Sequence, residues 1–139
     1  MPEPRRLALI GCSKSKLSTP ARARDLYTGS LFTKSLRYAE LTCDATAILS
    51  AKYGLVQLDD VIHPYNAKIT DMPIGHRRAW AWLVKAALEH AFPFPHWTYV
   101  YLAGSLYIEG LPKGDTPMQN LRNGKRLRWL TARLESHRE

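Results

Sequence analysis

Three short apolar runs stand out along the chain, at residues 7–10, 46–49 and 97–102. Runs of this length with few polar interruptions are typical of strands that are buried on both faces of a sheet. The first run predicts a strand over residues 6–12, and the other two predict strands over residues 46–49 and 97–102. All three are short enough to be core strands of a parallel sheet.

Between and after these runs, apolar residues recur at helical spacing. Phe32, Leu36 and Ala39 share one face of a helix predicted over residues 31–41, for which Ser30 is the expected N-cap. Two further helices are predicted over residues 75–91 and 117–134, although Gly124 weakens the second. The tryptophans of these helices are expected to belong mostly to the core: Trp80, Trp82 and Trp129.

Strands and helices alternate, which predicts an α/β fold: a single three-layer domain over residues 1–139, with a mostly parallel sheet flanked by helices. Residues 57–71 are expected to be irregular, because Pro64 and Pro73 exclude a regular helix there. In open parallel sheets, ligands bind outside the carboxyl ends of the strands. Small or polar residues follow all three predicted strands, so we expect a binding rim there.

Composition narrows the class of protein. The chain has 139 residues, of which 45% are hydrophobic and 23% charged, as in an ordinary globular domain. It holds no apolar run long enough to span a bilayer and no apparent signal peptide, so we expect a cytoplasmic protein with no membrane partner. Cys12 and Cys43 lack metal-ligand spacing, and we expect free thiols, no metal site and no cofactor.

The formal net charge is +8, and the excess of Lys and Arg is concentrated in the first 40 and the last 19 residues. If the two ends lie together, they form one positive face that favours polyanions, and nucleic acid or a nucleotide is the expected partner. The alternative is a small protein that is basic without binding anything specific.

The first predicted strand leads into Gly11-Cys12-Ser13-Lys14-Ser15-Lys16. Backbone N–H groups, hydroxyls and ammonium groups in such a loop form a plausible cradle for a phosphate. The alternative is an exposed polar turn, and the glycine spacing of an ATP or dinucleotide loop is absent. Cys12 is also a candidate nucleophile, against the alternative of an inert strand-end cysteine.

The second predicted strand ends in Ser50, Lys52 and Tyr53. Ser50 and Lys52 are candidates to bind or neutralise an oxyanion, and Tyr53 is a candidate to stack on a base. The alternative places Tyr53 at the edge of the core and Lys52 in solvent.

The following loop carries Asp60, His63, Tyr65 and Asn66. Asp60 or His63 is a candidate general base acting on a water molecule, although either can instead have a purely structural role in a turn. Tyr65 and Asn66 are candidates to contact the face and the edge of a base.

Several motifs in the same order resemble an α/β domain family of bacteria and phages. They are the loop of residues 11–16, Asp25-Leu26-Tyr27, residues 48–55, Pro64-Tyr65-Asn66, and Gly104 with Tyr107. Residues 49–55, followed by Pro64-Tyr65, also resemble the YaaA peroxide-stress proteins, which bind DNA. The loop of residues 12–16 is similar to one in archaeosine synthases, which work on a deazaguanine base in tRNA.

This resemblance implies a partner that is nucleic acid or one of its bases, and it adds Tyr27, Gly104 and Tyr107 to the candidate substrate-binding residues. We therefore expect an enzyme that cleaves an N-glycosidic bond or modifies a base. Ser13, Lys14 and Lys16 would hold a phosphate, and Asp60 would orient water. The alternative is a non-enzymatic DNA-binding stress-response protein that uses its basic terminal segments.

Overall fold

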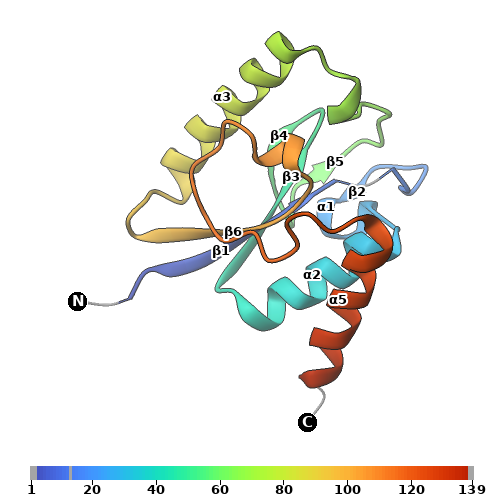
Figure 1. The fold of residues 1–139 in the computed structure, drawn as a ribbon. Helices are drawn as coiled ribbons and strands as arrows, with labels where there is room; N and C mark the ends of the chain where they lie inside the picture. Colours follow the sequence, from blue (N-terminus) through green and yellow to red (C-terminus); the bar gives the residue numbers. More distant parts are fainter. Residues whose placement is uncertain (1–2, 13, 138–139) are drawn as a thin grey trace.

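The computed structural model describes residues 3–12 and 14–137, and its main sheet has the strand order β4-β3-β1-β6 (Figure 1). The central strand β1 (Arg5–Gly11) pairs in parallel with β3 (Ala45–Ser50) on one side and with β6 (Trp97–Leu102) on the other. The edge strand β4 (Gly54–Gln57) runs antiparallel to β3. The α/β class, the three predicted strands and the mostly parallel sheet are confirmed, whereas β4 was not predicted.

Helices cover both faces of this sheet. Helices α2 (Ser30–Thr42) and α5 (Asn123–Ser136) lie on one face, and α3 (Ile74–Ala91) lies on the other (Figure 1). Because successive side chains of a strand point to opposite faces, Ala8 and Ile10 pack on the α2–α5 side and Leu7 and Leu9 on the α3 side. Each face thus has its own apolar core, and the domain has three layers.

The predicted helices differ from the observed ones in detail. Helix α2 begins one residue early, with Gly29 rather than Ser30 at its N-cap. Helix α5 begins at Asn123 instead of residue 117, because Asn120 has a φ of 67°, in the left-handed region, which a continuous helix cannot accommodate. Trp82 was expected in the core, but it is 73% exposed, whereas Trp80 on the same helix is buried.

Short elements occupy the loops. Strand β2 (Ala21–Arg22) pairs antiparallel with β5 (Val61–Ile62), and α1 (Ala23–Leu26) follows β2. The 3-10 helix η1 (Ile69–Asp71) lies in the segment expected to be irregular, and α4 (Ser105–Ile108) follows β6. None of the described helices is both long and apolar enough to cross a membrane.

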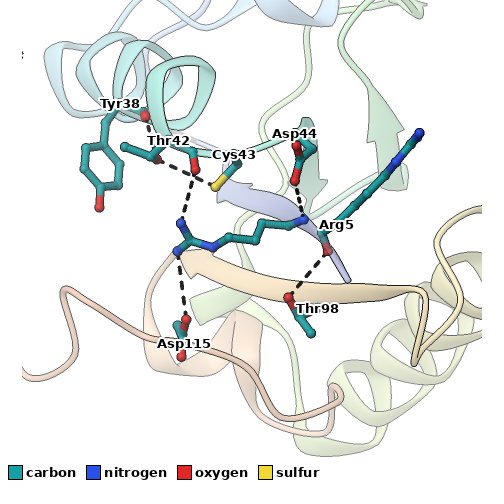
Figure 2. Close-up of polar contacts among 8 residues, drawn as sticks. Arg5, Tyr38, Thr42, Cys43, Asp44, Thr98 and Asp115 are labelled. Atoms are coloured by element: carbon teal, nitrogen blue, oxygen red, sulfur yellow. Dashed lines mark hydrogen bonds and ion pairs between the residues drawn. The ribbon is translucent and has the colours of Figure 1, made fainter. Parts of the chain in front are cut away.

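Polar contacts fix the amino end of the sheet (Figure 2). The Arg6 guanidinium donates to the Thr42 carbonyl at 3.1 Å and lies 3.9 Å from the Asp115 carboxylate. The Arg6 backbone N–H donates to the Asp44 carboxylate at 2.7 Å. These contacts join the start of β1 to the end of α2 and to the segment beside β6, away from the rim where a ligand is expected.

The carboxyl ends of the three parallel strands meet at the opposite rim. The chain passes from β1 to β3 through α2 on one face and then reaches β6 through α3 on the other, so the order reverses at β1. Such a reversal opens a crevice where α/β proteins bind ligands. The strand ends lie close together here, because a Cβ on Gly11 would be 3.1 Å from the Ala103 Cβ.

Candidate functional site

Three buried hydroxyl groups form a chain beneath the rim. The Tyr27 and Tyr65 hydroxyls lie 2.6 Å apart, and the Ser50 hydroxyl donates to that of Tyr65 at 2.8 Å. Tyr27 comes from the end of α1, Ser50 from the last position of β3 and Tyr65 from the loop after β5. The structure thus brings together three candidate residues that are far apart in the sequence.

The Ser50 hydroxyl also closes the turn after β3. Its oxygen accepts the backbone N–H groups of Lys52 at 3.2 Å and Tyr53 at 3.0 Å. The Ser50 carbonyl accepts the indole N–H of Trp80 at 2.8 Å, which ties the turn to α3. These contacts engage Ser50 within the protein, so its placement indicates support of the rim rather than contact with a substrate.

A second polar contact joins the other strand ends. The Cys12 Sγ lies 2.9 Å from the Tyr107 hydroxyl, and the backbone N–H of Ala51 donates to the same sulfur at 3.4 Å. Cys12 follows β1, Ala51 follows β3, and Tyr107 belongs to α4 after β6. The three strand ends expected to converge are therefore linked through one thiol.

Burial changes the acidity of these tyrosines. Burial raises the pKa of Tyr27 to about 12, even though the hydroxyl of Tyr65 favours the ionised form. Burial, reinforced by the neighbouring Cys12, also raises the pKa of Tyr65 and of Tyr107. All three phenols stay protonated at neutral pH and act as neutral hydrogen-bonding groups.

A cavity of about 590 Å³ opens at this rim. Three lysines line it, Lys14, Lys16 and Lys68, together with the thiol and phenol pair of Cys12 and Tyr107. The remaining polar side chains in its lining are Asn66, Thr70, Asp71 and Asn123. A smaller hollow of about 240 Å³ shares Lys14, Lys16 and Asn66 and extends to Tyr65. The lining is cationic overall, since it has three lysines and one carboxylate, that of Asp71.

Lys16 is the most enclosed of the three lysines. Its ammonium lies 4.5 Å from the centroid of the Tyr65 ring and 5.7 Å from that of Tyr27. Burial lowers the pKa of Lys16, and the ammonium of Lys68 lowers it further, whereas Cys12 acts in the opposite direction. An anion bound between Lys16 and Lys68 would relieve this repulsion. A base could stack on the ring face of Tyr65 under Lys16 only if that side chain moved, which argues against the stacking role expected of Tyr65.

Two candidates lie away from the cavity. Asp60 is exposed, and its carboxylate accepts the backbone N–H of Gln57 at 2.9 Å, which closes the turn between β4 and β5. The Lys52 ammonium is exposed and sits 5.3 Å from the centroid of the Tyr53 ring. Neither is among the described residues that line the rim cavity. The alternative interpretations, a turn residue and a solvent-facing lysine, describe these positions better than the catalytic roles do.

The remaining candidate residues are not among the described residues that line the rim cavity. Tyr53 is 38% exposed, its ring lies nearly perpendicular to that of Tyr65 with the centroids 5.6 Å apart, and the Lys52 ammonium lies over its face. Gly104 is the N-cap of α4 beside Tyr107. His63 is exposed, and its carbonyl accepts the Tyr53 hydroxyl at 3.5 Å. Ser13 lies outside the described residues.

Six residues of the cavity lining were not found by sequence reasoning: Ala67, Lys68, Ile69, Thr70, Asp71 and Asn123. Lys68 is the N-cap of η1 and Asp71 is its last residue, in a segment for which the prolines predicted only the absence of a regular helix. Asn123 starts α5, whose beginning was placed six residues too early. Among the described residues, no group of three His, Cys, Asp or Glu side chains could hold a metal ion.

Comparison with known protein families finds a match that covers most of the chain. A family described as "Family of unknown function (DUF6884)" matches residues 7–132. The chain belongs to the DUF6884 family. This DUF6884 match extends from β1 into α5 and includes every cavity residue named above.

The DUF6884 chain is also similar to the "Uncharacterized protein YfjM" of Bacillus subtilis (strain 168), with 36% identity over 64 residues. The aligned part is 42% of this chain and 43% of that relative, so less than half of each protein is matched. No solved structure matches the chain.

Proposed function

We propose that this protein acts on nucleotides or nucleic acid and that the rim cavity binds a phosphate group. The observation that carries the proposal is the convergence of Lys14, Lys16 and Lys68 on one cavity. Ammonium groups bind phosphate through charge-assisted hydrogen bonds, each worth about 1.5–3 kcal/mol when partly buried. The net charge of +8 favours the same class of ligand.

We further propose that the protein is an enzyme that acts on the nucleobase. Asp71 is the carboxylate in the cavity lining, so the role first assigned to Asp60 passes to it. In glycosidic hydrolysis, Asp71 would orient a water molecule and accept its proton while the oxygen adds to C1′ of the sugar. The C–N bond breaks, its electron pair goes to the base nitrogen, and the proton that Asp71 accepted passes to the departing base. Asn66, which lines the same cavity, would contact the edge of the base.

Resemblance of the motifs to YaaA proteins and to archaeosine synthases supports the nucleic-acid direction, and we retain the cytoplasm as the proposed location. Base modification without release is the second reaction compatible with this proposal. The two differ in product, because only hydrolysis liberates a free base.

The test is incubation with mononucleotides, single- and double-stranded DNA and tRNA, followed by mass analysis of free bases and of the polymer. Lys68→Ala should reduce turnover or phosphate binding by about 10- to 100-fold, from the loss of one charge-assisted contact. Lys52→Ala, which removes the same charge outside the cavity lining, is the matched control and should change either by less than about threefold. No reaction on any substrate would remove the enzyme proposal. Equal effects of Lys68→Ala and Lys52→Ala would refute the proposal that the rim cavity is the binding site.

A second candidate function, DNA binding without catalysis, is favoured by the packing of α2 against α5. The Lys34 ammonium donates to the Thr131 hydroxyl at 2.5 Å, so basic residues from the two ends of the sequence lie on neighbouring helices. A surface that contacts several phosphates loses affinity steeply with salt. Affinity for duplex DNA that stays flat between low and moderate salt would refute this second function.

A further inference from the structure

Two large aromatic side chains are exposed on the α3 side of the sheet. Trp82, in the middle of α3, is 73% exposed, and Phe94, just after the helix, is 71% exposed. The neighbouring Trp80 and Val84 already supply the buried face of α3. The packing of this helix therefore does not account for an aromatic residue at position 82.

Both aromatic residues line grooves whose other lining residues come mainly from α3, α4 and the segment after α4. The first groove, of about 330 Å³, has Trp82 and Ala81 in its lining, and the second, of about 560 Å³, has Phe94 and Pro112. Lys85 lines both grooves. The two grooves thus share one lysine, and each has an exposed aromatic side chain in its lining.

The charge of this surface is mixed but predominantly positive. Its cationic side chains are Arg77, Arg78, Lys85 and Lys113, and its acidic ones are Glu89 and Glu109. Exposed π-faces interspersed with Arg and Lys suit a ligand that combines planar apolar groups with repeated negative charges. Single-stranded nucleic acid has this chemistry, because its bases are free to stack while its phosphates meet the cations.

We propose that this face of α3 binds single-stranded nucleic acid, with bases stacked on Trp82 and Phe94 and phosphates held by Arg78, Lys85 and Lys113. A duplex fits less well, because its bases are already stacked on each other. The proposal stands on the α3 face alone and does not depend on phosphate binding in the rim cavity. It also differs from DNA binding on α2 and α5, which lie on the opposite face of the sheet (Figure 1).

The test is fluorescence anisotropy with a labelled oligothymidylate of about 12 nucleotides at low salt. Trp82→Ala and Phe94→Ala should each weaken binding at least about fivefold, because one base loses its stacking partner. Leu83→Ala is the matched control, since Leu83 is 68% exposed on the same helix and is not among the described residues lining either groove. It should change the affinity less than about twofold. The oligonucleotide should also quench tryptophan fluorescence in the parent protein and much less in Trp82→Ala.

Several outcomes would overturn the proposal. One is the absence of oligothymidylate binding, and another is an equal loss of affinity in the Leu83→Ala protein. A third is loss of affinity in Lys125→Ala, on α5, with none in Trp82→Ala, which would place the strand on the opposite face. A fourth is a parent dimer that Trp82→Ala converts to a monomer without altering oligonucleotide affinity, which would make this face a contact between copies of the chain. Circular dichroism melting of each variant separates these results from a loss of fold.

Discussion

Replacing Ser50 with alanine tests whether the hydroxyl at the end of β3 supports the rim. The substitution removes the acceptor of the Lys52 and Tyr53 backbone N–H groups and the donor to the Tyr65 hydroxyl. A hydrogen bond in a protein contributes about 0.5–1.5 kcal/mol net, so three bonds amount to about 1.5–4.5 kcal/mol. Because the turn residues Lys52 and Tyr53 are exposed, their N–H groups can rebind water. We therefore expect a loss of about 2–3 kcal/mol in the free energy of unfolding.

Urea denaturation followed by circular dichroism measures this loss. With a denaturant slope of about 1.5–2 kcal/mol per M, the midpoint should fall by about 1–2 M. Ser18→Ala, in the exposed loop before β2, is the control, and it should shift the free energy of unfolding by less than about 0.5 kcal/mol. The reasoning is refuted if Ser50→Ala costs no more than this control.

A double-mutant cycle isolates the bond between Ser50 and Tyr65. Tyr65→Phe removes a hydroxyl that lies 2.8 Å from that of Ser50 and 2.6 Å from that of Tyr27. If the first contact is a real bond, the double variant should be less destabilised than the sum of the single variants, by about 0.5–1.5 kcal/mol. Additive effects would show that Ser50 acts through the turn alone.

Three other predictions concern stability. Because the folded-state pKa of Tyr27 is raised to about 12, its contribution to the free energy of unfolding is present below pH 10 and is lost as pH rises from about 10 to 12. Other buried tyrosines also lose stability in this range, so urea titration should show a loss in the parent protein that exceeds the loss in Tyr27→Phe by up to about 2.7 kcal/mol. Gly114→Ala should lower the free energy of unfolding by at least about 2 kcal/mol, because the new Cβ would clash with the Tyr99 carbonyl oxygen. Gly75→Ala on α3 has open space around its Cβ and should raise the free energy of unfolding by about 0.5–1 kcal/mol; thermal melts measure both changes. Trp80→Phe should cost about 1–3 kcal/mol in urea titration, because the Ser50 carbonyl loses its indole donor, and a neutral result would show that water replaces it.

Much of the fold could be predicted because apolar patterning has a direct physical cause. Strands buried on both faces must be apolar at consecutive positions, and β1, β3 and β6 satisfy this condition. Strand β4 was missed because it sits at the edge and only Val56 in it is buried. The start of α5 was misplaced because the left-handed backbone of Asn120 leaves no periodic signal.

The candidate site was predicted in part for similar reasons. Convergence of strand ends follows from parallel topology, so Cys12, Ser50 and Tyr107 could be grouped before their contacts were known. Lys68 and Asp71 line the cavity because of the course of an irregular loop, and the spacing of apolar residues does not predict that course. The prediction that Trp82 lies in the core was wrong, because the buried positions on α3 form a narrower stripe than its apolar residues do.

The central position of β1 has a consequence for how the chain folds. The two strands that pair with β1 lie at very different separations from it along the sequence: Leu7 pairs with Ala45 in β3 and with Tyr99 in β6. Such contacts raise the relative contact order, which slows folding because long loops must close before any pairing is gained. During synthesis, β1 and β3 can pair early, but one side of β1 stays without a partner until β6 has been made. In that interval an apolar strand with free N–H and C=O groups is exposed, and this is the step at which misassociation with other chains competes with folding.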